Sequence, residues 1–230
     1  MGFISAGFEK QHISYNQIHT AISTAVVEQE IYEKFQPTII LAIGGGGFVP
    51  ARMLRTFLKR SCGKSLPIQT IGLILYDDDA NGYDPTQARV RKTQWLNYGS
   101  GEGTGINLQG QRILIVDEVD DTRKTLSFAV SELQKDIDAQ EADYASRKTA
   151  SDPEFQAPKL GVFVVHNKKK IKAAQLPAEI MDNSYFACVQ VEDAWLAYPW
   201  DSLDIEDHQL RADAREVLRV QSEAETPAGM

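Results

Sequence analysis

Cysteine is scarce in this sequence: 230 residues contain only Cys62 and Cys188, in unrelated contexts. This argues against disulfides and against a zinc site, which needs several Cys or His ligands. His12, His19 and His208 lie in no recognisable motif, so we expect them at the surface. No stretch approaches the roughly 18 unbroken apolar residues of a membrane span, and no basic segment precedes an apolar one at the N-terminus. We therefore expect a cytoplasmic protein without a membrane partner.

Basic residues are also fewer than acidic residues. Lys and Arg number 24 against 32 Asp and Glu, which gives a net charge of −8 and a pI near 5.1. So acidic a chain lacks the positive field that binds nucleic acid or anionic membranes, and we expect neither as its main partner. Any phosphate site must therefore be a local feature. Hydrophobic residues make up 43%, enough at this length for one α/β domain with a large core.

Short apolar segments alternate with helical patterns along the chain. This alternation predicts a mostly parallel twisted sheet flanked by helices, with ligands at the C-terminal ends of the strands. A capping box at Ser14 and Gln17 predicts a helix that runs to about Phe35. Gly63 is expected to end a second helix as its C-cap. The expected strands cover residues 38–43, 68–75, 113–116, 160–165 and 185–191.

We expect a single domain over residues 1–219. Residues 76–105 form a long polar stretch, which predicts a mobile loop, because long loops in compact domains are usually functional or disordered. Residues 135–158 are polar and predict an extended helix end and an exposed insertion. The small, acidic residues 220–230 predict a disordered tail.

Residues 112–125 combine a buried strand with the start of a helix. Four acids, at positions 117, 118, 120 and 121, separate the apolar residues 113–116 from the hydroxyl-rich run 122–125. The free N–H groups and the dipole at such a helix N-terminus form a cradle for a phosphate. Carboxylates beside a phosphate suit sugar hydroxyls, Mg²⁺ or proton transfer. The alternative is an ordinary turn with solvated acids, where Asp is favoured in any case.

A second strand–helix junction is rich in glycine. It consists of Gly44, Gly45, Gly46 and Gly47. Glycine lets the backbone approach a pyrophosphate closely, although a tight turn explains the run equally well. A dinucleotide fingerprint does not fit, because its third glycine would fall on Val49. Residues 63–65 end like a P-loop, but its first glycine would fall on Leu58, so we reject that interpretation.

Residues 112–125 resemble the phosphoribosyl-pyrophosphate signature of type I phosphoribosyltransferases. Their form is most similar to that of fungal hypoxanthine-guanine phosphoribosyltransferases. The resemblance implies that family's fold, with a small hood that binds the purine, and usually a homodimer. It also implies a Mg²⁺-dependent reaction in which phosphoribosyl pyrophosphate and hypoxanthine or guanine give IMP or GMP and pyrophosphate.

The resemblance assigns roles along the signature. Asp117 and Glu118 match the pair that binds the ribose hydroxyls and Mg²⁺. Asp121 matches the acid that exchanges a proton with purine N7, which suits a carboxylate whose pKa is raised by neighbours such as Asp120. The donor-binding set is completed by Asp120 and by the 5′-phosphate loop, Thr122, Arg123, Lys124 and Thr125. Many relatives have glycine where Arg123 stands, and a side chain is acceptable there only if the φ of that residue is negative, which we therefore expect.

The segment 191–201 resembles the purine-binding stretch of the same family. By that match Trp195 stacks on the base, Leu196 contributes backbone contacts, and Asp201 holds Mg²⁺ or its water. The alternative for Trp195 is an ordinary core aromatic. After the strand 160–165, Lys168 is the expected donor to purine O6, and a shift of alignment would give that place to His166.

Two further stretches fit the resemblance. The glycine run matches the pyrophosphate loop, in which many relatives carry a basic residue; glycine at that position leaves only backbone donors here. Residues 76–105 resemble the hood that closes over the reacting centre and excludes water. We expect its residues Arg91, Lys92, Gln94 and Trp95 to become ordered on closure.

Two alternative functions stay open at this point. A xanthine-preferring phosphoribosyltransferase would differ by as little as one contact near purine O2. A non-catalytic regulator that binds phosphoribosyl pyrophosphate would keep the donor site without turnover. Such regulators are often basic, whereas this chain is acidic.

Overall fold

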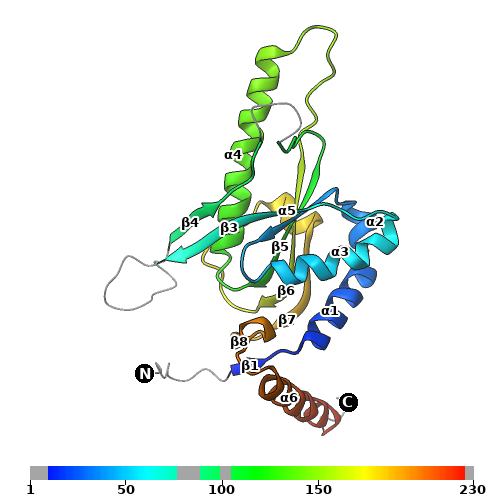
Figure 1. The fold of residues 1–230 in the computed structure, drawn as a ribbon, viewed down its shortest axis with the longest axis vertical. Coiled ribbons are helices and arrows are strands. Elements are labelled where there is room, and N and C mark those ends of the chain that lie inside the picture. The colour runs from blue at the N-terminus through cyan, green and yellow to red at the C-terminus, as the bar shows by residue number, and fades with distance from the viewer. Residues whose placement is uncertain (1–9, 77–88, 99–104, 226–230) are drawn as a thin grey trace.

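The computed structural model describes residues 10–76, 89–98 and 105–225 (Figure 1). Its strands are β1 (Lys10–His12), β2 (Ile39–Ile43), β3 (Ile68–Tyr76), β4 (Arg89–Gln94), β5 (Arg112–Asp120), β6 (Lys159–Lys168), β7 (Tyr185–Val191) and β8 (Trp195–Ala197). Its helices are α1 (Tyr15–Glu28), α2 (Ile31–Phe35), α3 (Phe48–Cys62), α4 (Lys124–Arg147), α5 (Ala178–Asn183), the 3₁₀ turn η1 (Pro199–Asp201) and α6 (Ile205–Glu225). No helix in these ranges has the length and apolar character needed to cross a bilayer.

Within the described ranges, six strands form the central sheet in the order β4-β3-β2-β5-β6-β7. All neighbours are parallel except β4, which runs antiparallel to β3 at the edge. The predicted mostly parallel sheet is thus confirmed. Because the strands are parallel, the C-terminal ends of β2, β5 and β6 meet at one edge of the sheet, where the acidic loop and the glycine turn also lie. Strands β1 and β8 form a separate parallel pair.

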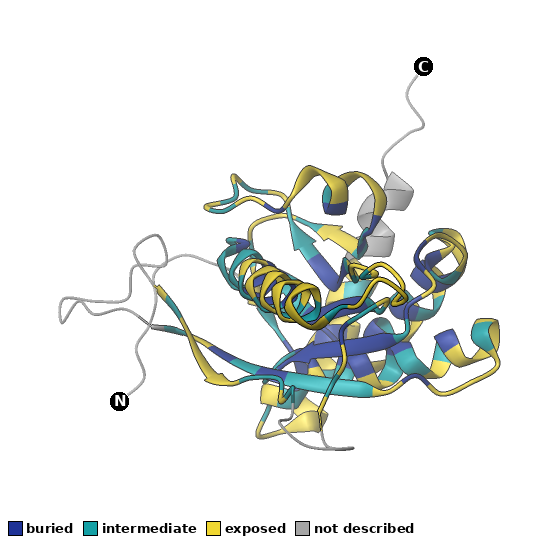
Figure 2. Ribbon diagram, turned by 90° about the horizontal axis from the view of Figure 1, so that it is seen from above, coloured by how far each residue is buried: buried dark blue, intermediate teal, exposed yellow. Residues whose placement is uncertain are grey.

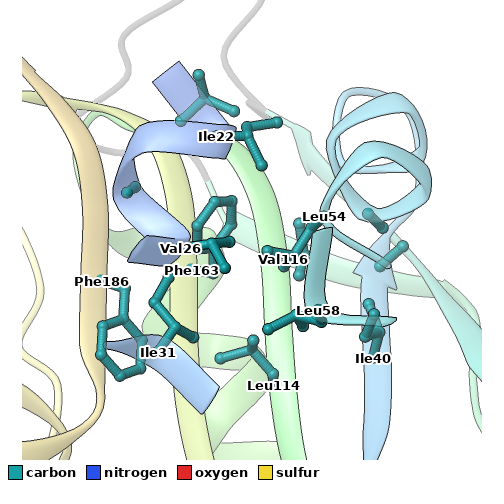
Figure 3. Packing of buried hydrophobic residues seen from close by; sticks show 14 of the residues in the cluster. Ile22, Val26, Ile31, Ile40, Leu54, Leu58, Leu114, Val116, Phe163 and Phe186 are labelled. Carbon is teal, nitrogen blue, oxygen red and sulfur yellow. The ribbon is translucent and has the colours of Figure 1, made fainter. Parts of the chain in front are cut away.

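Helices cover both faces of the sheet. Alternate residues of each central strand point to opposite sides, so Ile40 and Leu114 pack against α1 and α3, whereas Leu41 and Ile113 pack against α4. Figure 3 shows the first of these clusters. Figure 2 shows the buried positions concentrated along the strands and on the inward sides of the helices. This sandwich fixes the strand ends from which the site is built.

The predicted first helix is divided in two. It starts at the Ser14–Gln17 capping box as expected, but α1 ends at Glu28 and α2 begins at Ile31. Glu30 between them has a φ of 51°, so the chain turns there instead of continuing as one helix. This turn allows Ile31 to be fully buried in the core. The expected C-cap at Gly63 is confirmed by its φ of 72°.

Part of the predicted 76–105 loop is a strand. Strand β4 pairs with β3, and residues on and after it contact α4: Lys92 Nζ lies 2.7 Å from Glu132 Oε2, and Trp95 Nε1 donates to Asp136 Oδ2 at 2.6 Å. The expectation that the segment Arg91–Trp95 becomes ordered only on closure is therefore wrong. Residues 77–88 and 99–104 lie outside the described ranges, and with them most of the predicted mobile loop.

The C-terminal region departs from the prediction. Helix α6 continues to Glu225, past position 219 where the disordered tail was expected to begin; residues 226–230 are not described. His208 on this helix is buried rather than exposed, and its Nε2 lies 2.9 Å from the carbonyl oxygen of Ile13. This contact attaches α6 beside β1. His19 is exposed, as expected.

Candidate active site

The glycine turn after β2 lies directly against the acidic loop. Gly45 has a φ of 91°, which favours glycine. A Cβ on Gly47 would lie 2.5 Å from the backbone carbonyl oxygen of Val116, and a Cβ on Gly46 would displace the carboxylate of Glu118. The turn therefore needs glycine both for its conformation and for the close approach of β5.

Asp117 and Glu118 stand side by side at the end of β5. Asp117 is buried, and this burial, together with the charge of Glu118, raises its pKa well above the usual value. Glu118 has a buried Oε2 to which no described residue offers a hydrogen bond. Buried polar atoms normally have partners, so this oxygen marks a place where a hydroxyl group or a cation would bind.

Asp120, the last residue of β5, is buried. Its Oδ2 accepts from Arg123 Nε at 2.9 Å and from the Tyr185 hydroxyl at 2.7 Å, and it forms an ion pair with Arg123 Nη2 at 2.8 Å. Arg123 also lies over the ring of Tyr185, 5.3 Å from its centroid. The structure therefore places the Asp120 carboxylate in an internal ion pair and not in the predicted donor-binding set around the cavity.

The expected negative φ at Arg123 is wrong: its φ is 68°, the left-handed conformation typical of glycine. Three contacts of its side chain stabilise this conformation, namely the ion pair with Asp120, the ring of Tyr185 and a contact of Nη1 with Met181 Sδ at 3.5 Å. The sequence could not show this, because Tyr185 and Met181 are distant in the chain.

The side chain of Asp121 does not join the Asp120–Arg123 ion pair but contacts residues at the end of β6. Its Oδ2 accepts from Lys168 Nζ at 2.9 Å, and its Oδ1 forms an ion pair with Lys170 Nζ at 3.0 Å. Burial alone would raise the pKa of Asp121, but the two lysines more than offset this and hold it below its usual value. The expectation of a pKa raised by neighbouring acids is therefore wrong, because the nearest charges are positive.

The structure separates the two candidates for the purine O6 contact. Lys168 lines the cavity beside Asp121. His166 is buried, and its Nδ1 lies 2.9 Å from the hydroxyl of Tyr198, which donates to the carbonyl oxygen of Glu118 at 3.1 Å. Burial lowers the pKa of His166 to about 4. Of the two, Lys168 is in the position that the prediction requires.

A cavity of about 540 Å³ opens at this edge of the sheet. The predicted site residues in its wall are Asp117, Glu118, Asp121, Thr122, Arg123, Thr125, Lys168 and Trp195. The side chain of Trp195 is 57% exposed, which contradicts the core-aromatic alternative. Residues from β5, the β5–α4 loop, β6 and β8 thus converge on one space.

Besides Asp120 and the glycine turn, three predicted residues lie outside this wall. Lys124 is the first residue of α4, and Leu196 packs against the core cluster beneath β8. Asp201 is exposed on η1 and borders a separate hollow of about 430 Å³, so the structure does not bring it together with Asp117 and Glu118. In the described ranges, no group of three or more His, Cys, Asp or Glu residues is arranged to hold a metal.

Three further charged residues were not predicted. Lys170 and Asp193 line the cavity and form an ion pair at 3.0 Å. Lys172 Nζ donates to the backbone carbonyls of Asp120 at 2.6 Å, Asp121 at 3.0 Å and Lys168 at 2.9 Å. The basic run after β6 was the available signal, but such runs are more often solvated turns.

Known proteins extend these observations. No family model matches the sequence. Hypoxanthine-guanine phosphoribosyltransferase of Schizosaccharomyces pombe is 46% identical over 200 residues, which cover 86% of this chain and 91% of that protein. The chain belongs to the hypoxanthine-guanine phosphoribosyltransferase family. It is a transferase, and the resemblance of residues 112–125 to this family is confirmed. Xanthine phosphoribosyltransferase 1 of Saccharomyces cerevisiae is also similar, with 43% identity over 210 residues, 90% of this chain and 97% of that protein.

Solved structures share the fold of this chain. A protein from Neisseria gonorrhoeae, crystallised with bound ppGpp, superimposes with a TM-score of 0.68 and 34% identity over 92% of this chain and 99% of its own. The purine phosphoribosyltransferase of Pyrococcus horikoshii superimposes with a TM-score of 0.55 at 19% identity, over 85% and 96% of the two chains. The second likeness shows the shared fold, as the predicted type I phosphoribosyltransferase architecture requires.

Proposed function

We propose that this protein transfers the phosphoribosyl group of phosphoribosyl pyrophosphate to N9 of hypoxanthine or guanine, which gives IMP or GMP and pyrophosphate. The observation that carries the proposal is the convergence of Glu118, Asp121, Lys168 and Trp195 on one cavity beside a helix N-terminus. The identity with the Schizosaccharomyces pombe enzyme supports the choice of purines.

The β5–α4 loop is suited to bind the donor. The N-terminus of α4, with the hydroxyls of Thr122 and Thr125 in the cavity wall, offers donors to a 5′-phosphate. Asp117 and Glu118 are placed for the ribose hydroxyls, and the unpartnered Glu118 Oε2 supplies an acceptor. In the glycine turn next to Glu118, the N–H groups of Gly44 and Gly47 donate to the carbonyls of Ile71 and Ile43, so the N–H groups of Gly45 and Gly46 are the proposed donors to the pyrophosphate.

Mg²⁺ fits this arrangement. The ion prefers one or two carboxylates combined with substrate oxygens and waters, and two adjacent carboxylates with a free oxygen meet that requirement. Asp117 and Glu118 would hold it. When bound, the ion neutralises charge on the pyrophosphate leaving group.

The opposite wall is suited to the base. Trp195 offers an exposed ring for stacking, its neighbour Leu196 offers backbone groups, and Lys168 is placed to donate to purine O6. Asp121 is held as a carboxylate and accepts the N7 proton as the N9–C1′ bond forms and the bond from C1′ to pyrophosphate breaks. The protein's contribution is therefore orientation together with charge stabilisation.

A competition assay tests the proposal. The purified protein receives phosphoribosyl pyrophosphate, Mg²⁺ and equal amounts of hypoxanthine, guanine, xanthine and adenine, and the nucleotides are separated by chromatography. We expect IMP and GMP. An excess of XMP would favour the xanthine-preferring alternative, which is supported by the 43% identity with xanthine phosphoribosyltransferase 1 of Saccharomyces cerevisiae. No nucleotide, with donor binding intact, would favour the non-catalytic regulator.

Two features of the proposal rest on family membership. We propose a homodimer, to be checked by light scattering, and a cytoplasmic location, to be checked by fractionation of cells.

The ppGpp held by the Neisseria protein is a guanosine nucleotide, and it supports a site that accepts guanine in this chain.

A further inference from the structure

Four charged side chains form a closed ring in the cavity wall. Lys168 Nζ lies 2.9 Å from Asp121 and 3.7 Å from Asp193, and Lys170 Nζ lies 3.0 Å from each of the same two carboxylates. The ring joins the end of β6, the β5–α4 loop and the turn before β8. Two positive and two negative charges alternate, so the ring as a whole is neutral.

The proposed reaction uses half of this ring. If Lys168 donates to purine O6 and Asp121 takes the N7 proton, both residues turn towards the base. Lys170 and Asp193 then remain, already 3.0 Å apart and neutral as a pair. Without Lys170, the nearest cation to Asp193 would be Lys168, which already lies 3.7 Å from it. Asp193 would then compete with the purine for Lys168.

Resting on the proposed function, we propose that Lys170 is a positioning residue, which holds Asp193 so that Lys168 stays available to the purine. The backbone supports this arrangement, since the N–H of Lys169 donates to the carbonyl of Val191 at 2.7 Å and fixes the two segments against each other. The pair also anchors the turn that leads into Trp195.

The surroundings of Lys170 agree with a permanent charge. Burial lowers the pKa of this ammonium, but its contacts with Asp121 and Asp193 more than compensate and raise the pKa above the usual value. Its side chain is 28% exposed and those of both carboxylates about 40%, so solvent screens the ring and moderate effects are expected.

The chain provides a matched control one residue away. Lys169 pairs with Glu192 at 3.1 Å, across the same two segments, but both side chains are exposed and neither contacts the ring. Replacing Lys169 removes the same charge from the same strand end while leaving all four ring members in place.

The test is a double-mutant cycle on the full chain. Lys170→Met is expected to raise the KM for hypoxanthine about fivefold while the KM for phosphoribosyl pyrophosphate stays within twofold, roughly the scale of coupling within a salt-bridge network. Adding Asp193→Asn removes the competing carboxylate and is expected to restore the KM for hypoxanthine to within about twofold of wild type. Lys170→Arg should retain the wild-type KM, and so should Lys169→Met.

Calorimetric binding of IMP to the same variants gives a second readout that is independent of turnover, and thermal melting shows that each variant is folded. An active wild type whose double variant is no better than Lys170→Met would overturn the inference alone, and so would an equal effect of Lys169→Met. A wild type that neither forms nor binds IMP or GMP would overturn the proposed function, and this inference with it.

Discussion

The two walls of the cavity hold their charges differently. At the end of β5 and in the loop after it, Asp120 and Arg123 are buried and form an ion pair with each other, and Asp120 also accepts from the Tyr185 hydroxyl. Across the cavity, Lys170 and Asp193 are partly exposed and pair two separate segments. A buried ion pair suits a wall that must keep one shape for a phosphate and a sugar. Partial exposure suits a wall whose contacts are replaced when a base enters and leaves.

The largest effect is expected when the buried ion pair between Asp120 and Arg123 is broken. Asp120→Ala leaves Arg123 without its counter-ion in a buried site and in a left-handed conformation. We expect a loss of about 3–5 kcal/mol in the free energy of unfolding, typical of a broken buried pair. Urea denaturation measures it. The control is Asp207→Ala, which breaks the exposed pair with Arg211 and should leave the urea midpoint unchanged. Equal midpoints for the two variants would contradict the structural role of Asp120.

A smaller effect is expected at the neighbouring carboxylate. Asp121→Asn keeps the shape and an acceptor for Lys168 but cannot take a proton. We expect kcat to fall about a hundredfold or more, as for the loss of a general base, while both KM values change little. Steady-state kinetics measures it. Asp193→Asn serves as the control, because it removes a carboxylate from the same ring without touching the proton acceptor. An unchanged kcat in Asp121→Asn would remove this residue from the chemistry.

The smallest of the three effects concerns the exposed wall alone. Trp195→Ala is expected to raise the purine KM about tenfold, since stacking of a base on an aromatic ring is worth about 1–3 kcal/mol. Trp195→Phe keeps an aromatic ring, so its purine KM should lie between those of the wild type and Trp195→Ala. The KM for phosphoribosyl pyrophosphate and the melting temperature should remain close to wild type, because the side chain is 57% exposed. A lower melting temperature with an unaltered purine KM would assign Trp195 to packing instead.

The sequence predicted the parts of the molecule that local pattern encodes. The central strands and the capping box at Ser14 depend on residues close in the chain, and the structure shows them where they were expected. The acidic stretch was expected to follow a strand that ends at Val116, but β5 continues to Asp120, so Asp117, Glu118 and Asp120 lie on the strand itself. The pairing of β4 with β3 was missed because its six residues are mostly polar and exposed, so they lack the alternation of a half-buried strand.

Contacts between distant segments could not be predicted in the same way. Arg123 adopts a positive φ because of Tyr185, more than 60 positions away, and Lys170 meets Asp193 across 23 positions. His208 is buried only because α6 lies on the carbonyl of Ile13. In each case the conformation, pairing or burial of the side chain depends on packing between distant segments, which cannot be read from the spacing of residues along the chain.

Lys172 joins two backbone segments beside the cavity. An ammonium group has three hydrogens, and here all three have carbonyl acceptors, two on the β5–α4 loop and one at the end of β6. Although it is a cation close to the phosphate cradle, Lys172 therefore has no donor left for a substrate. It ties the backbone at the end of β5 to the backbone at the end of β6, so the side chains that line the cavity there start from backbones that are fixed to each other.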